Sequence, residues 1–296
     1  MQPIHYFNRY SGKVETEEVY GDRFLRWVYG NPLGKLALHA LVKKSLFSQW
    51  YGKQMDSPGS KARVLPFISK YGLNVGEFAE APEQFKTFNE FFYRKLKQGA
   101  REIAADPRAP VFPADGRHLG FQDVSKISGI FVKGAFFNLN DLFQSEQLAK
   151  KYAQGSMVIS RLCPVDYHRF HFPVGGVPGE TRLIGGPLFS VNPIALRQNI
   201  RILTENRRAW CEIDSPEFGA VAMFEVGATC VGRFIYTYAA GQAVRKGDEK
   251  GYFKFGGSLT ITLFEPGRVR LAADLLENTA VQRELYARMG DALGIG

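Results

Sequence analysis

The spacing of hydrophobic residues changes about a third of the way along the chain. In the first hundred residues the apolar positions recur at the three- and four-residue intervals of an amphipathic helix, which predicts helices over 22–50, 65–71 and 87–96. Pro32 lies inside the first of these ranges and is typical of the first turn of a new helix. The pattern therefore predicts a helical N-terminal region.

After Pro107 and Pro110 the apolar residues form short runs separated by Gly, Pro and Asn, which is typical of strands and turns. The predicted strands span residues 130–132, 157–162, 168–174, 221–231, 234–238, 252–255 and 259–264. A last helix is predicted over 274–293. We expect an α+β fold, with N-terminal helices packed on a core of antiparallel β-sheets. The helical region at 1–105 and the β-rich region at 106–296 are expected to form one compact unit.

Two glycines interrupt strand-like sequence in the stretch 251–267. Gly256 and Gly257 stand directly before Ser258. Glycine weakens a strand and usually marks a bulge, a turn or a close approach of the backbone to another group. One interpretation is that Gly257 presents its carbonyl to the Ser258 hydroxyl without a side chain in the way. The other is an ordinary hairpin with a glycine bulge, and this stretch alone favours the hairpin.

Composition and charge narrow the class of protein. The 296 residues are 45% hydrophobic and 23% charged, which is a globular rather than a disordered composition. The formal net charge of +9 favours an anionic partner such as a phospholipid surface. No zinc-finger spacing, RNP-like segment or dense Lys/Arg block indicates a nucleic-acid partner. The three cysteines are widely spaced without a CxxC pair, so neither a disulfide framework nor a metal site is predicted.

Contact with a membrane is expected to be peripheral, because no apolar run reaches the roughly 18 residues that a spanning helix needs. Residues 22–51 mix basic and aromatic side chains, which suits a lipid headgroup interface. This segment is interpreted either as an amphipathic anchor on the membrane surface or as two helices packed on the protein's own core, with equal weight. With the first interpretation, region 1–105 is membrane-associating and the expected localisation is the cytoplasmic face of the membrane.

Four polar side chains are candidates for catalysis. Asp115 lies in the turn sequence PADGR, and His168 and His171 lie in the aromatic segment DYHRFHFP. An acid, a histidine and a serine can form an acid–base–nucleophile set, whose order along the chain varies between folds. The candidate serine is Ser258. It does not belong to a G-x-S-x-G nucleophile elbow, because residue 260 is threonine.

A serine that follows glycine can attack its own backbone instead. The Oγ of Ser258 would add to the Gly257 carbonyl, the amide would become an ester, and β-elimination would cut the chain between these two residues. Loss of ammonia from the resulting dehydroalanine leaves a pyruvoyl group on the new N-terminus.

Longer motifs make the sequence resemble the phosphatidylserine decarboxylase family from end to end. The shared motifs are YGNPLGKLALH, FKTFNEFFYRKLKQGARE, PADGR, VKGAFFNLNDLF, VDYHRFHFPV, FSVNPIALRQNIRILTENRRA, FEVGATCVGRF and FKFGGSLTITLF. The combination of DYHRFH, SVNPIAL and GGS is highly specific, although no single motif would be convincing alone.

The resemblance implies a self-cleavage triad of Asp115, His171 and Ser258. In it His171, oriented by Asp115, deprotonates Ser258 for attack on the preceding carbonyl. Cleavage would give a β chain of residues 1–257 and an α chain of residues 258–296. The α chain is expected to contribute an inner strand of the sheet, which would hold the two chains together without a disulfide.

The resemblance also implies the reaction. The implied cofactor is the covalent pyruvoyl group derived from Ser258, whose carbonyl would bind the amine of phosphatidylserine and act as the electron sink. Carbon dioxide would leave and phosphatidylethanolamine would be released, with His168 taking part in decarboxylation or in protonating the product. The implied partners are phosphatidylserine, an anionic membrane surface and the other chain of the same precursor. A homodimer is expected from the resemblance alone.

Three other functions compete with this interpretation. A pyruvoyl enzyme of the same architecture could decarboxylate a free amino acid, although the basic and aromatic segment 22–51 argues against a soluble substrate. A lipid-binding protein that never cleaves itself would not need Asp115, His171, Gly257 and Ser258 together. A serine esterase with the same triad would keep the chain in one piece.

Overall fold

The computed structural model describes residues 3–38, 45–127, 137–229, 234–256 and 258–296. The predicted strand 130–132, the end of the predicted strand 221–231 and Gly257 lie outside the described residues.

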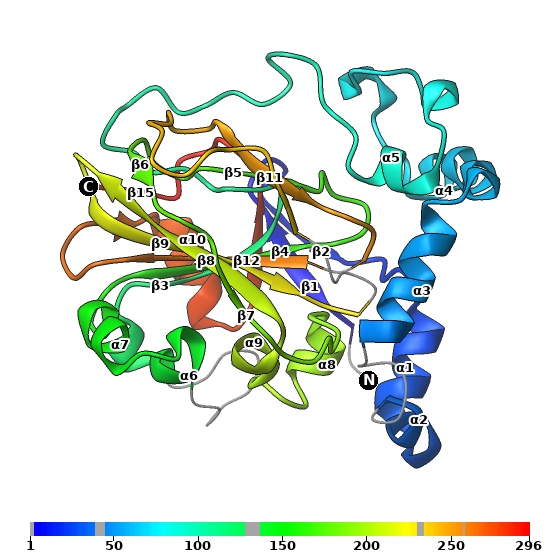
Figure 1. Cartoon of the computed structure of the whole chain (residues 1–296), viewed down its shortest axis with the longest axis horizontal. Helices are drawn as coiled ribbons and strands as arrows, with labels where there is room; N and C mark the ends of the chain where they lie inside the picture. Colours follow the sequence, from blue (N-terminus) through cyan, green and yellow to red (C-terminus); the bar gives the residue numbers. More distant parts are fainter. Residues whose placement is uncertain (1–2, 39–44, 128–136, 230–233, 257) are drawn as a thin grey trace.

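One large sheet forms the centre of the molecule (Figure 1). Ten strands of the described chain belong to it: in spatial order β2 (Lys13–Thr16), β1 (His5–Asn8), β14 (Glu284–Ala287), β3 (Gly116–Phe121), β4 (Met157–Leu162), β12 (Ser258–Phe264), β9 (Gly219–Gly227), β8 (Arg208–Ser215) and β6 (Val177–Pro178), with β7 (Arg182–Ile184) also paired to β8. Neighbouring strands are antiparallel except β1 and β14, which are parallel. The sheet is therefore mixed rather than purely antiparallel.

Two smaller sheets complete the β structure in the described residues. One contains β10 (Phe234–Tyr236), β11 (Glu249–Phe253) and β5 (Arg169–His171), and the other contains β13 (Arg270–Leu271) and β15 (Gly294–Ile295). A completely buried ion pair joins the three-stranded sheet to the large one, because Lys250 Nζ of β11 lies 2.6 Å from Glu225 Oε1 of β9.

Strand β12 lies inside the large sheet, hydrogen-bonded to β4 on one side and to β9 on the other. Its alternation of aliphatic and threonine residues predicts a strand, and all seven of its residues are buried. Leu259, Ile261 and Leu263 enter one hydrophobic cluster, so Thr260 and Thr262 face the opposite side of the sheet. The predicted α+β class with an inner strand near the C-terminus is confirmed.

The helices lie around the sheet (Figure 1). At one end of the view are α1 (Asp22–Gly30), α2 (Pro32–Ala37), α3 (Ser45–Met55), α4 (Val64–Tyr71) and α5 (Phe88–Phe92). Below the sheet are α6 (Leu139–Phe143), α7 (Glu146–Tyr152), α8 (Pro193–Leu196) and α9 (Ile202–Glu205), and α10 (Ala273–Ala280) packs on β3 and β14. Within the described residues no helix is long and apolar enough to cross a membrane.

Several predicted helix boundaries are wrong. The predicted helix 87–96 ends at Phe92, because Leu96 pairs with Phe78 in an isolated β-bridge. The predicted helix 274–293 ends at Ala280, and Gln282 then adopts a left-handed φ of 56°. Residues 284–287 instead form β14 between β3 and β1. The expectation that nearly all helices precede residue 105 is also wrong, since α6 to α9 follow it.

The strand predictions are confirmed most closely where the alternation is longest. Strand 157–162 coincides with β4, and 259–264 lacks only the first residue of β12. The predicted strand 168–174 is reduced to β5, because residues 172–174 leave the ladder. Strands β1, β2, β3 and β8 were not expected from the pattern.

Candidate active site

Ser258 is the first residue of β12 and is completely buried. It is paired with Leu162 at the end of β4 and with Gly227 at the end of β9. Its Oγ lies 3.0 Å from Nδ1 of His168. The serine is therefore fixed on both sides by the sheet, and its hydroxyl is held by an imidazole.

The hydrogen bonds of His168 determine its tautomer. Its Nε2 lies 2.8 Å from the carbonyl oxygen of Cys163, which can only accept, so Nε2 carries the proton. Nδ1 is then free of hydrogen and accepts the hydroxyl proton of Ser258. The ring of Phe92 stacks on the imidazole with centroids 3.7 Å apart and fixes its plane.

His168 is neutral in this environment. Burial lowers its pKa to about 3, and the nearby positive charge of Arg94 acts in the same direction against the hydrogen bond to Cys163. An imidazole with so low a pKa accepts hydrogen bonds well but is a weak proton acceptor.

His171 lies on β5 and has different partners. Its Nδ1 donates to the Gly247 carbonyl at 2.9 Å, and its Nε2 accepts from the Tyr167 hydroxyl at 3.3 Å. Burial lowers the pKa of His171, while the hydrogen bond to Gly247 and the charges of Glu249 and Asp115 oppose this shift. Arg169 acts in the same direction as burial, and the pKa of His171 stays below its ordinary value.

Asp115 precedes β3 and is buried. Its carboxylate accepts from Nε and Nη2 of Arg101, at 2.6 Å for the closest pair, and from the backbone N–H of Met289 at 2.9 Å. Asp115 influences His171 through its charge rather than through a hydrogen bond.

The structure thus brings together Ser258 and His168. It does not bring His171 or Asp115 into hydrogen-bond contact with Ser258. Gly257, the other half of the predicted cleavage site, lies outside the described residues.

Two contacts of His168 could not be found from the sequence. The Cys163 contact uses a backbone carbonyl, for which a sequence has no signal. Phe92 lies in the predicted helix 87–96, and nothing in that pattern indicates that its ring stacks on His168. Asp166 lies in the same motif as both histidines. It accepts from the Cys163 N–H at 2.6 Å and pairs with buried Arg117, and these two contacts hold the loop before His168 in place.

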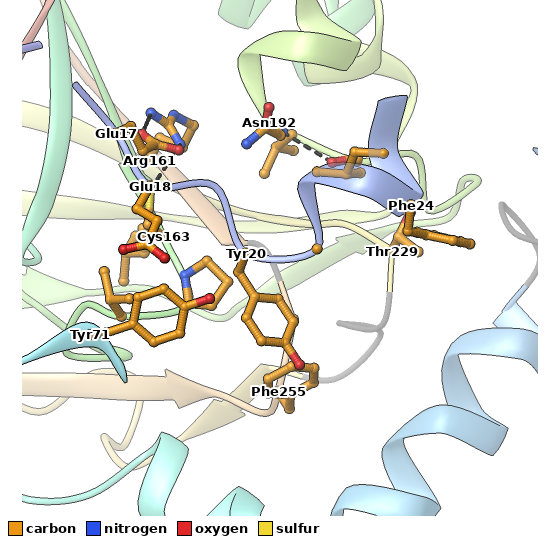
Figure 2. A pocket seen from close by; sticks show the side chains of 18 of the residues that line it. Glu17, Glu18, Tyr20, Phe24, Tyr71, Arg161, Cys163, Asn192, Thr229 and Phe255 are labelled. Atoms are coloured by element: carbon orange, nitrogen blue, oxygen red, sulfur yellow. Dashed lines mark hydrogen bonds and ion pairs between the residues drawn. The ribbon is translucent and has the colours of Figure 1, made fainter. Parts of the chain in front are cut away.

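A cavity of about 500 Å³ reaches Leu162, which is paired with Ser258, and also Cys163 and Gly256, while Ser258 itself does not line it. Its lining is mainly apolar and aromatic and includes Tyr20, Phe24, Leu25, Tyr71, Val191 and Phe255. Figure 2 shows the rings of Tyr20, Tyr71 and Phe255 on one side of this space, with Asn192 and Arg161 across from them. Such a space suits a molecule with a large apolar part and a polar head.

The titratable residues do not suggest a metal site. In the part of the chain that the structure describes, no group of three or more His, Cys, Asp or Glu residues could hold a metal ion. Arg161, a buried cation on the cavity wall, is paired with Glu17 and Glu284.

Comparison with known proteins gives consistent matches. A sequence model described as phosphatidylserine decarboxylase matches residues 88–295. The phosphatidylserine decarboxylase proenzyme of Fusobacterium nucleatum subsp. nucleatum is 43% identical over 293 residues, covering 99% of this chain and 98% of its own. The proenzymes of the same name from Clostridium kluyveri and Chlamydia muridarum are 41% and 43% identical over 292 and 293 residues, covering 99% of this chain and 99% and 97% of their own.

Proposed function

The chain belongs to the phosphatidylserine decarboxylase family, and from this premise we propose that it converts phosphatidylserine into phosphatidylethanolamine and carbon dioxide. We propose further that it first cuts itself between Gly257 and Ser258. The observation that carries the proposal is the hydrogen bond of the buried Ser258 hydroxyl to a neutral His168 beside an apolar cavity.

Self-cleavage uses only groups of this chain and water. The Ser258 Oγ adds to the Gly257 carbonyl carbon as its proton leaves, and the peptide C–N bond breaks to give an ester and a free amine. Loss of the Ser258 α-proton then breaks the ester C–O bond, which releases a Gly257 carboxylate and leaves dehydroalanine. Its imine form adds water and loses ammonia, which leaves the pyruvoyl group.

The base for the first step is assigned from the family resemblance, because the hydrogen bonds place His168 rather than His171 against the hydroxyl. His168 touches the hydroxyl, but a pKa of about 3 makes it a poor acceptor for the proton. His171 has the charges of Glu249 and Asp115 to stabilise a proton. We therefore retain His171, supported by Asp115, as the base that the family resemblance implies. If His171 is the base, the Ser258 hydroxyl must break its hydrogen bond to His168 and form one to His171. The hydrogen bond from Tyr167 to Nε2 of His171 must also break.

The site suits the pyruvoyl group that this processing would create. Ser258 is completely buried, its Oγ faces an imidazole, and the cavity is lined by Leu162 and Gly256 nearby in the sheet and along the chain. When formed, the pyruvoyl group supplies a carbonyl that takes up the electron pair left when carbon dioxide departs. His168 is assigned a part in the decarboxylation step, as the family resemblance implies, because its Nδ1 is the ring nitrogen that faces position 258.

The proposed substrate source is a membrane surface. Phe24, Trp27, Leu33, Leu36 and Trp50 are large apolar side chains of α1 to α3 that remain exposed, with Leu33 73% exposed and Trp50 56% exposed. Phe24 and Trp50 also line the cavity. Peripheral docking of these helices, aided by the net charge of +9, would bring the cavity to anionic lipid.

The function is tested with purified protein and vesicles of phosphatidylserine and phosphatidylcholine. We expect phosphatidylethanolamine and carbon dioxide from the wild-type protein and none from Ser258→Ala. Release of carbon dioxide from free serine but not from the vesicles would support the amino-acid decarboxylase instead. An apolar cavity of about 500 Å³ argues against so small and polar a substrate.

A further inference from the structure

Phe255, three residues before Ser258, is held by a buried side chain of α5. Its backbone N–H donates to Oδ1 of Asn89 at 2.8 Å, and Asn89 is 0% exposed. The other end of the same amide, Nδ2, donates to Asp56 at 2.8 Å. Asp56 also pairs with Lys254 at 3.2 Å. One amide thus ties the backbone ahead of the cleavage site to the N-terminal helices.

The ring of Phe255 is held as well. Its centroid lies 4.9 to 5.8 Å from those of four aromatic rings, which we call the aromatic cage: Tyr20, Tyr51, Phe88 and Phe92. Figure 2 shows the ring of Tyr20 directed at Phe255. Phe92 also stacks on His168, so the aromatic cage and the candidate site share a side chain.

On the other side of the cleavage site Ser258 is fixed by the sheet and by His168. Between the two fixed points Gly256 has a φ of 140°, a conformation that side-chain-bearing residues rarely adopt. The backbone that leads toward Ser258 is therefore held at Phe255 and turned at Gly256, and Ser258 itself is held by the sheet. Alignment of a nucleophile with a carbonyl is the property on which such intramolecular reactions depend.

We propose that Asn89 is a positioning residue for self-cleavage: together with the aromatic cage it holds Phe255, and with it the backbone that leads into the cleavage site. This inference rests on the proposed self-processing. Asn89 itself neither lines the cavity nor contacts Ser258, His168 or His171, so neither the chemistry nor the cavity otherwise gives it a role.

The test follows self-cleavage of freshly synthesised chain over time by denaturing mass spectrometry. Asn89→Ala removes the acceptor for the Phe255 N–H, and we expect cleavage to slow about tenfold or more, since small misalignments are costly in such reactions. The matched control is Asn278→Ala, which removes another buried asparagine, one that bonds within α10 and to Arg283. This control is expected to cleave at the wild-type rate.

A double variant separates positioning from packing. In Asn89→Asp with Asp56→Asn the carboxylate at 89 still accepts from Phe255 and the amide at 56 donates to it, so these two hydrogen bonds are kept and the ion pair of Asp56 with Lys254 is lost. We expect this variant to cleave within about threefold of the wild-type rate, because the hydrogen bond to Phe255 is kept. A double variant as slow as Asn89→Ala would overturn the proposal.

Two further outcomes would also overturn it: a wild-type rate for folded Asn89→Ala, or equal slowing in Asn278→Ala. Folding is checked by thermal unfolding in a Ser258→Ala background. If Asn89→Ala does not fold, Phe255→Leu is used instead, because it removes the ring that the aromatic cage holds and leaves Asn89 intact. Slower cleavage of this variant supports the proposal, and an unchanged rate contradicts it. A wild-type chain that never cleaves would instead refute the proposed function itself.

Discussion

The Oγ of Ser258 and the Nδ1 of His168 lie 3.0 Å apart, joined across 90 residues of sequence. The carbonyl of Cys163 fixes the proton of His168 on the far nitrogen, so the near nitrogen can only accept. This contact binds the hydroxyl strongly, yet the same burial that creates it lowers the basicity of the imidazole. We therefore expect substitutions of His168 and of His171 to have different effects.

Substitution of each histidine is expected to separate cleavage from decarboxylation. We expect His171→Ala to remain uncleaved, because it removes the imidazole that two carboxylates support. We expect His168→Ala to be cleaved but to decarboxylate at least about 100-fold more slowly per processed chain, since the imidazole that faces position 258 is lost. Denaturing gels and phosphatidylethanolamine formation measure the two steps.

The reverse pattern would contradict this division. If His168→Ala stays whole and His171→Ala is cut, the direct hydrogen bond identifies the base. Asp115→Asn should resemble His171→Ala, because it removes one of the two charges that support a proton there.

Removing one partner of the buried ion pair of Lys250 and Glu225 is expected to lower the free energy of unfolding more than replacing both partners by apolar residues. Lys250→Met leaves an unpaired carboxylate whose other oxygen accepts from Tyr236, and it should lower the free energy of unfolding by about 3–5 kcal/mol. Lys250→Met combined with Glu225→Leu should cost clearly less, because no charge stays buried. Urea unfolding in the uncleaved Ser258→Ala background measures both. Equal losses in the single and double variants would contradict the ion-pair explanation.

The stability of the fold should fall in mild acid. His118 and His168 are completely buried, and burial lowers the pKa of each to about 3, whereas the unfolded chain titrates these groups near 6.5. Below about pH 6.5 the unfolded state therefore binds protons that the folded state does not, and stability is lost as the pH falls from about 6.5 toward 3. Above that range the two groups add no pH dependence.

Each of these histidines contributes a slope of up to about 1.4 kcal/mol per pH unit. Between pH 6 and pH 4 the free energy of unfolding should fall less in His118→Gln than in the parent chain, by about the slope that one histidine contributes. Urea unfolding of the Ser258→Ala chain at each pH measures it. An unchanged slope would show that His118 does not resist protonation. His118 is suitable because it bonds to Ser160 and Ala287 rather than to Ser258.

Membrane docking is expected to depend on the exposed apolar residues of α1 to α3. Leu36→Ser should weaken binding to anionic vesicles by roughly tenfold, or about 1.5 kcal/mol, if this side chain enters the lipid. Val281→Ser is the control, since Val281 is similarly exposed but follows α10. Vesicle sedimentation measures both, and equal effects of the two variants would argue against docking through these helices.

The sequence predicts local structure best where one face of an element is clearly apolar. Strand β12 follows from alternation of Leu259, Ile261 and Leu263 with threonines, and its burial follows from the same pattern. Strand β14 does not follow from any local pattern. It forms because residues 284–287 pair with β1, which lies almost the whole chain away.

The candidate active site, too, could be predicted from local sequence only in part. Ser258, His168 and His171 can be recognised from their motifs, but which histidine meets the serine depends on how β5 and the loop from Cys163 fold onto β12. The carbonyl of Cys163 and the ring of Phe92 acquire their roles only from that arrangement.

The intact mass of the purified protein under denaturing conditions, measured beside Ser258→Ala, tests the central claim most directly. The account predicts two chains in the wild-type sample, the smaller beginning at a blocked residue 258 that reacts with carbonyl reagents. The variant should stay whole at 33.2 kDa. A single 33.2 kDa chain in both samples would contradict self-processing at Ser258.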